Sequence, residues 1–169
     1  MAHAPLAVAN VLIQKHPGQI DPMKLQKLLY FANGWWLAVK GQPLLSERPQ
    51  VWRYGPVFKS IYRDFSRFGR SKIPEPERRS PFDHNPPFVE GPEAEEISQM
   101  LDWVWSGYGH RSGGELSDET HKPGTPWRKI AEREKYEVSP NTEIDPAEDW
   151  SYFAELARAR GLDVRPLAA

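Results

Sequence analysis

The longest amphipathic pattern in the chain runs from Asp21 to Gly41 and predicts a buried central helix. One face carries apolar residues at helical spacing, and a second set extends the apolar surface towards the opposite side: Leu25, Leu28, Leu29, Ala32 and Trp36, then Tyr30, Phe31, Trp35, Leu37 and Val39. Asp21 is a favourable N-cap, Pro22 suits the first turn, and Gly41 suits the residue just past the end. We therefore expect other elements to pack around this helix on several sides.

The same spacing predicts helices before and after the central one. Pro5 to Lys15 should form the first. A helix after Gly55-Pro56 should bury Phe58, Ile61, Tyr62 and Phe65 and stop at Gly69. Later helices are expected from about Pro92 to Tyr108, from a Ser112 cap through Leu116, from a Thr125 cap to about Lys135, and from Asp145-Pro146 onward with Trp150, Phe153 and Leu156 inward.

Only one stretch favours a strand. Pro49 to Tyr54 carries Val, Trp and Tyr between a proline and a glycine. A lone strand leaves its backbone groups unpaired, so we expect a partner strand around Ser71 to Pro74. The pattern as a whole predicts a mainly α, single-domain helical bundle over residues 1–169. It has a small β element near 50–55, a proline-rich loop over 71–92, and a frayed tail over 162–169.

Composition narrows the class of protein. The 169 residues are 39% hydrophobic, enough for one core, and contain no cysteine, which excludes disulfides, thiolate metal sites and cysteine nucleophiles. We find neither a signal-like N-terminus nor an apolar run of roughly 20 residues, the length that spans a bilayer. We therefore expect a cytoplasmic protein with no membrane partner.

The net charge of −1 hides an asymmetry between the two halves. Residues 1–80 hold 13 Lys and Arg against 5 Asp and Glu, whereas the remainder holds 9 against 18. A basic surface could serve an acidic partner or a nucleic acid. Alternatively, the two halves pack together and neutralise each other.

Three motifs, in order, resemble the Panacea domain of SocA-like antitoxins, a family that includes phage-associated proteins. They are Met23 to Phe31 followed by Trp35, Trp52 to Val57 with Tyr62, and Thr120 to Trp127. The resemblance covers about residues 6 to 157 and implies a mainly helical antitoxin. Such a protein would neutralise a cognate protein toxin, encoded by the adjacent gene, through direct binding. The family offers no established catalytic residues to carry over.

The residues themselves favour binding over catalysis. The five histidines show neither HxH nor HExxH spacing, so we expect no metal and no cofactor. Asp118, Glu119 and His121 could form an acid–base group with Ser117 or Thr120 as nucleophile, but no nucleophile elbow or phosphate loop accompanies them. The structural interpretation is that Thr120 and His121 satisfy backbone groups at a helix end. We therefore expect a protein that is not an enzyme, with a hydrolase as the weakest alternative.

Candidate partner contacts are Lys24, Lys27, Trp52, Arg53, Tyr54, Lys59 and Arg63, because Trp, Tyr and Arg are enriched at tight interfaces and the lysines are the polar remainder of their helices. The other motif residues are expected to hold the structure: Leu25, Gln26, Leu28, Tyr30, Gly55, Pro56, Tyr62, Thr120, His121, Pro126 and Trp127. One alternative is a DNA-binding autoregulator, because the chain contains a basic run: Arg63, Arg67, Arg70, Lys72, Arg78 and Arg79. Another alternative is an accessory binding protein of a phage or mobile element.

Overall fold

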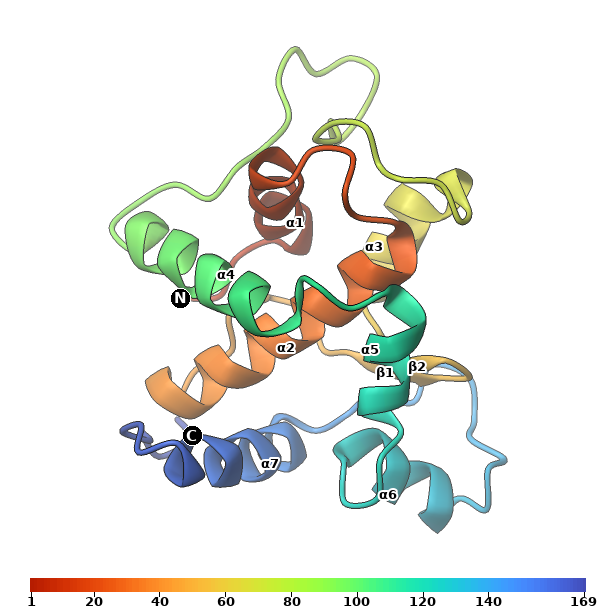
Figure 1. Ribbon diagram of the computed structural model, residues 1–169, viewed down its shortest axis with the longest axis vertical. Helices are drawn as coiled ribbons and strands as arrows, with labels where there is room; N and C mark the ends of the chain where they lie inside the picture. The colour runs from red at the N-terminus through yellow and green to blue at the C-terminus, as the bar shows by residue number, and fades with distance from the viewer.

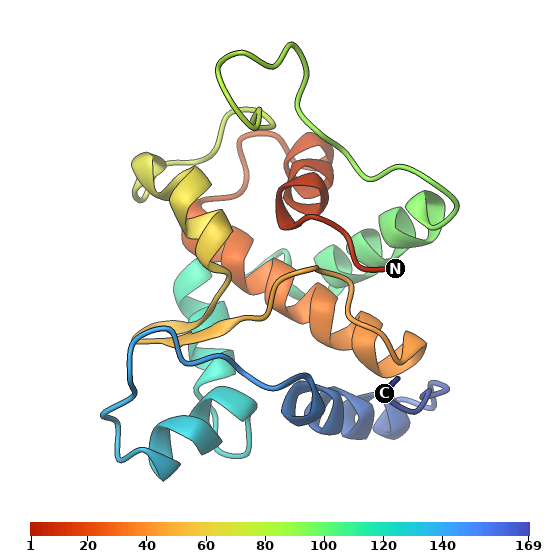
Figure 2. The same cartoon turned by 180° about the vertical axis from the view of Figure 1, so that it is seen from behind.

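Helix α2 (Pro22–Lys40) runs through the middle of the computed structural model, which describes residues 1–169 (Figures 1 and 2). The Asp21 carboxylate accepts a hydrogen bond from the Lys24 N–H at 2.9 Å, and Pro22 fills the first turn. At the other end Gly41 adopts a left-handed conformation with φ 73°. The central helix and both of its predicted ends are confirmed.

The fold is mainly α, as the sequence predicts. The elements, in chain order, are α1 (Pro5–Lys15), α2, β1 (Gln50–Trp52), β2 (Gly55–Val57), α3 (Lys59–Phe65) with a 3₁₀ turn η1 (Ser66–Phe68), α4 (Ala94–Tyr108), α5 (Gly113–Thr120), α6 (Pro126–Arg133) and α7 (Pro146–Ala159). Ser112, Thr125 and Asp145 cap the last three helices with their side chains. None of these helices combines the length and the hydropathy needed to cross a bilayer.

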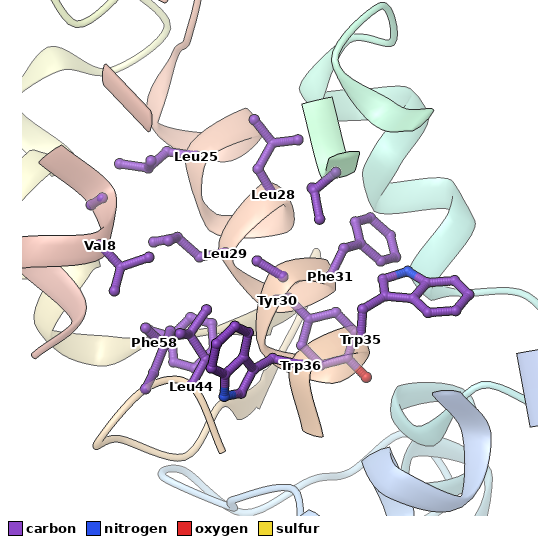
Figure 3. Close-up of a cluster of buried hydrophobic side chains, with 14 of the residues drawn as sticks. Val8, Leu25, Leu28, Leu29, Tyr30, Phe31, Trp35, Trp36, Leu44 and Phe58 are labelled. Carbon is purple, nitrogen blue, oxygen red and sulfur yellow. The ribbon is translucent and has the colours of Figure 1, made fainter. Parts of the chain in front are cut away.

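The apolar residues of α2 face different neighbours on its different sides (Figure 3). Leu25 and Leu29 point towards Val8 of α1, while Phe31 and Trp35 point the other way. The Phe31 ring stacks on Tyr108 of α4 with ring centroids 4.1 Å apart. All of these side chains belong to one cluster of 34 buried residues. This arrangement explains why the α2 sequence is apolar around most of its circumference.

Helix α7 crosses α2 at Gly34. The ring of Phe153 lies directly against the Gly34 backbone, where a methyl group would overlap it. One turn earlier on α2, the Tyr30 hydroxyl donates a hydrogen bond of 2.6 Å to the buried Asp149 carboxyl group. The contact between these two helices therefore combines a close backbone approach with one buried polar pair.

The prediction of a strand partner around Ser71 to Pro74 is wrong. The structure pairs β1 with β2 in an antiparallel hairpin in which Trp52 faces Gly55, so that Arg53 and Tyr54 form a two-residue turn rather than the end of a strand. A local turn closes at a smaller entropic cost than a loop of about 20 residues. The other edge of β1 is covered by residues 142–144, since the Val51 N–H donates to Thr142 O at 2.8 Å.

The proline-rich segment from 71 to 92 contains no helix or strand and arches over α1 (Figure 1). The buried Asn10 side chain of α1 holds it, donating hydrogen bonds to Glu77 O and Pro87 O and accepting one from the Glu77 N–H. The tail after Gly161, which we expected to fray, lies along the end of α2. Its Arg165 N–H donates to Ala38 O at 3.0 Å, and its Ala168 N–H to Gly41 O at 2.8 Å.

Candidate functional site

The three sequence motifs meet at the hairpin. Gly55 begins β2 at φ 112°, a conformation that favours glycine. A Cβ atom there would lie 2.6 Å from the Thr120 hydroxyl of α5 and 3.0 Å from Cε of Lys27 on α2. The glycine is therefore required both by its backbone conformation and by the close approach of α2 and α5.

Lys24 and Lys27, predicted as partner contacts, point inward instead. Lys27 is only 1% exposed and donates one hydrogen bond, 3.0 Å long, to Pro56 O. Burial lowers its pKa to about 7. The Lys24 ammonium is also buried, donates to Gly109 O, and has a lowered pKa because of burial. Because apolar residues surround both lysines along α2, their long side chains reach backbone carbonyls of neighbouring segments and not the surface.

Gln26 anchors the chain where the hairpin leads into α3. Its amide group donates to Phe58 O at 3.0 Å, and its carbonyl oxygen accepts from the Phe58 N–H at 2.9 Å. Since Phe58 is fully buried, a single side chain satisfies both of its backbone groups. Leu25 and Leu28 flank Gln26 in the core, so this part of the first motif acts through packing.

The third motif connects α5, α6 and the hairpin through backbone carbonyls. The hydroxyl groups of Ser117 and Thr120 donate to Tyr54 O and Ser117 O, each at 2.6 Å. Nδ1 of His121 lies 2.5 Å from Ser117 O, which it can contact only as a donor. After the turn, Pro126 starts α6 and Trp127 donates its indole N–H to Trp52 O at 2.7 Å.

The hydrogen bonds of the third motif do not assemble the candidate hydrolase group. The hydroxyl groups of Ser117 and Thr120 and the Nδ1 atom of His121 face main-chain carbonyl oxygens rather than one another. Glu119 pairs with Arg111 and Lys122, and these two cations hold its pKa below the usual range although burial acts the other way. No three His, Asp or Glu side chains converge as a metal site would require. The geometry supports a structural role for the third motif.

Six residues form the outward side of the hairpin and α3, here called the hairpin face: Trp52, Arg53, Tyr54, Lys59, Tyr62 and Arg63. Tyr62, predicted to be buried, is 51% exposed, because α3 turns only Ile61 and Phe65 towards the core. The Trp52 and Tyr62 rings pack together with centroids 4.9 Å apart, and the Arg53 guanidinium lies over the Tyr54 ring at 5.4 Å. The sequence motif identified Trp52, Arg53 and Tyr54, but not the partnership with Tyr62.

A mostly apolar pocket of about 430 Å³ adjoins the hairpin face. Val51, Trp52 and Arg53 form one wall, and Trp127, Ala131, Tyr136 and Val138 form the other. Tyr136 is 59% exposed and follows α6 with a positive φ of 61°. Tyr136 and Val138 carry no signal in the sequence, since they lie in a segment without helical or strand periodicity.

Comparison with known proteins fits this arrangement. The family profile described as "Antitoxin SocA-like, Panacea domain" matches residues 25–128. The chain belongs to this family. It is also 34% identical over 129 residues to the protein named Antitoxin SocA from Caulobacter vibrioides (strain NA1000 / CB15N), covering 74% of this chain and 69% of that protein. No solved structure matches the chain.

Within this Panacea domain, the matched residues include the whole hairpin face, the second and third motifs, and the first motif from Leu25 onward. Met23 and Lys24 precede the match, whereas Tyr136, Val138 and helix α7 follow it. Membership of an antitoxin family supports an antitoxin role. The matched motif residues are mostly those that join α2, α5 and the hairpin, and they hold the hairpin face in place.

The Thr125→Ala variant should lose about 1 to 2 kcal/mol of unfolding free energy. The Thr125 hydroxyl lies at a buried junction, where it contacts Thr120 O and Lys122 O and accepts from the Arg128 N–H. Thr142→Ala is the matched control, because it also removes a hydroxyl-to-carbonyl hydrogen bond, but an exposed one, and should cost less than about 0.5 kcal/mol. Urea unfolding followed by tryptophan fluorescence measures both, and equal losses would contradict the prediction.

Proposed function

We propose that this chain is an antitoxin that neutralises a cognate protein toxin by binding it directly in the cytoplasm, without catalysing a reaction. One observation carries the proposal. The hairpin face carries aromatic and cationic side chains at the surface. The possible catalytic groups behind it, the hydroxyl groups of Ser117 and Thr120 and the His121 ring, contact backbone carbonyl oxygens instead. Exposed Tyr, Trp and Arg side chains are the types that dominate binding energy at protein interfaces.

The autoregulator alternative has less support in the geometry. Of its basic run, Arg67 pairs with Glu77 and Lys72 lies 3.4 Å from Asp21. These carboxylates interrupt the row of free cations that a phosphate backbone would need. A labelled duplex carrying the upstream region of the gene, titrated with the protein at low salt, tests this alternative directly.

Co-expression with the neighbouring gene tests the proposal. The neighbour expressed alone should arrest growth, whereas co-expression with this chain should restore it, and the two proteins should co-purify. A harmless neighbour that forms no complex would contradict the proposal. The amount of neighbour protein after co-expression then separates two modes of neutralisation. An unchanged amount indicates a blocked toxin, and a fall indicates delivery to a protease.

A further inference from the structure

The charge asymmetry of the sequence is only partly neutralised by folding. Cations of α1 and α2 meet acidic residues of α4, with Lys15 at 2.9 Å from Asp102 and Lys40 at 2.6 Å from Glu96. The explanation that the two halves neutralise each other therefore holds for this side of the molecule.

The cations of the hairpin face have no carboxylate partner from the acidic second half of the chain. The Arg53 guanidinium, on the hairpin turn, lies over the Tyr54 ring and pairs with no carboxylate. Lys59 donates to the uncharged Asn141 side chain at 3.1 Å. Arg63, with 75% of its side chain exposed, has only its sequence neighbour Asp64 at 3.5 Å. Part of the excess positive charge of residues 1–80 is therefore available to a partner at the hairpin face.

We infer that the hairpin face receives an acidic surface of the toxin, one of whose apolar side chains enters the pocket between the hairpin and residues 136–138. This inference rests on the proposed function and adds the chemistry of the partner. Charge complementarity places carboxylates opposite Arg53, Lys59 and Arg63. The apolar walls of the pocket would bury one aliphatic or aromatic side chain at the edge of these charges.

A single-stranded nucleic acid also suits exposed aromatic rings and cations, but this geometry fits it less well. Stacked bases need rings presented face outward along a groove. Here the Trp52 and Tyr62 rings pack against each other with an angle of 59° between their planes. The Trp52 indole N–H is also bonded to Gln50, at 2.9 Å. We therefore favour a protein partner, and binding of an oligonucleotide is one of the outcomes that the experiment distinguishes.

The experiment measures the affinity of the purified neighbouring-gene protein for three forms of this chain, at about 50 mM and about 500 mM salt. The parent should bind, and more weakly at the higher salt. The Arg53→Glu, Arg63→Glu double variant should bind about 100-fold more weakly at low salt, because two attractive contacts become repulsive. The Arg78→Glu, Arg79→Glu double variant changes the net charge by the same amount on the proline-rich loop, and should bind within about threefold of the parent.

A further variant tests the pocket separately from the charge. Val138→Lys keeps the positive sign of the surface but places a long polar chain at the pocket, and should weaken binding about tenfold. All variants should keep the thermal midpoint of the parent within a few degrees, since the substituted side chains are exposed or only half-buried.

The outcomes distinguish a failure of this inference from a failure of the proposed antitoxin function. If the parent does not bind the neighbouring protein, the proposed function fails and the inference fails with it. If the parent binds and the Arg53, Arg63 variant binds equally well, or the two double variants lose affinity equally, the antitoxin proposal survives and the inference is overturned. Binding of a labelled 20-nucleotide RNA or DNA strand that is lost in the Arg53, Arg63 variant, without loss of the protein complex, would overturn it in favour of a nucleic-acid partner.

Discussion

The Gly34→Ala variant is expected to lose about 3 kcal/mol or more of unfolding free energy, although alanine is the better helix former. Gly34 lies in the middle of α2, where the Phe153 ring of α7 rests on its backbone, and an added methyl group would overlap three atoms of that ring. Phe153 is fully buried among Tyr30, Phe31 and Trp35, so its ring has no free space to move into. Relief would require the two helices to separate, which would disturb the packing of α7 on α2.

The matched control is Gly107→Ala in α4. Gly107 is also helical, but a Cβ atom there would meet no atom within 4 Å. Here only helix propensity acts, and the variant should gain about 0.5 to 1 kcal/mol. Urea unfolding of the two variants beside the parent measures the difference. Equal stability of both variants would show that α7 does not pack on α2 as described.

The elements that could be predicted from the sequence are those with local signals. Asp21, Pro22 and Gly41 mark both ends of α2, and Thr125 with Pro126 marks the start of α6, because caps and turns act within a few residues. Gly34 gave no comparable signal. Its role depends on a ring that lies more than a hundred residues further along the chain, and a glycine within a helical pattern otherwise indicates only a small loss of propensity.

The candidate site was predicted in part for the same reason. Trp52, Arg53 and Tyr54 could be named because residue type alone suggests an interface, and the structure exposes Arg53 and Tyr54 on a turn. Lys24 and Lys27 were placed wrongly, since a lysine on a helix surrounded by apolar residues can either reach water or donate to a buried carbonyl. The choice depends on Gly109 O and Pro56 O, which only the tertiary fold brings within reach.

The unfolding free energy is expected to pass through a minimum near pH 7, formed by two buried groups with opposite behaviour. Burial raises the pKa of Asp149 from 3.8 to about 7. Between about pH 4 and 7 the folded protein holds a proton here that the unfolded chain has released, so stability falls as the pH rises through this range. Burial lowers the pKa of Lys27 from 10.5 to about 7. Between about pH 7 and 10.5 the unfolded chain holds the extra proton, so stability rises with pH.

Two variants should each remove one of these two pH-dependent changes in unfolding free energy, and each variant serves as the control for the other. Asp149→Asn keeps an acceptor for the Tyr30 hydroxyl but cannot ionise, so it should abolish the fall from pH 4 to 7 and leave the rise above pH 7. Lys27→Met should do the reverse. Its loss of the hydrogen bond to Pro56 O costs the same at every pH, so this loss adds no slope to the profile.

Urea unfolding at intervals between pH 4 and 10 measures these changes, each of which should amount to several kcal/mol in the difference between parent and variant. The difference is the decisive quantity. The pKa of His16 is lowered mainly by burial, so His16 makes the unfolding free energy rise with pH in the range where Asp149 makes it fall. This contribution of His16 is the same in parent and variant and cancels in their difference. If the Asp149→Asn profile runs parallel to that of the parent between pH 4 and 7, the carboxyl group does not hold its proton in the folded protein. A parallel Lys27→Met profile above pH 7 would mean that the lysine reaches water, which would return it to the set of candidate partner contacts.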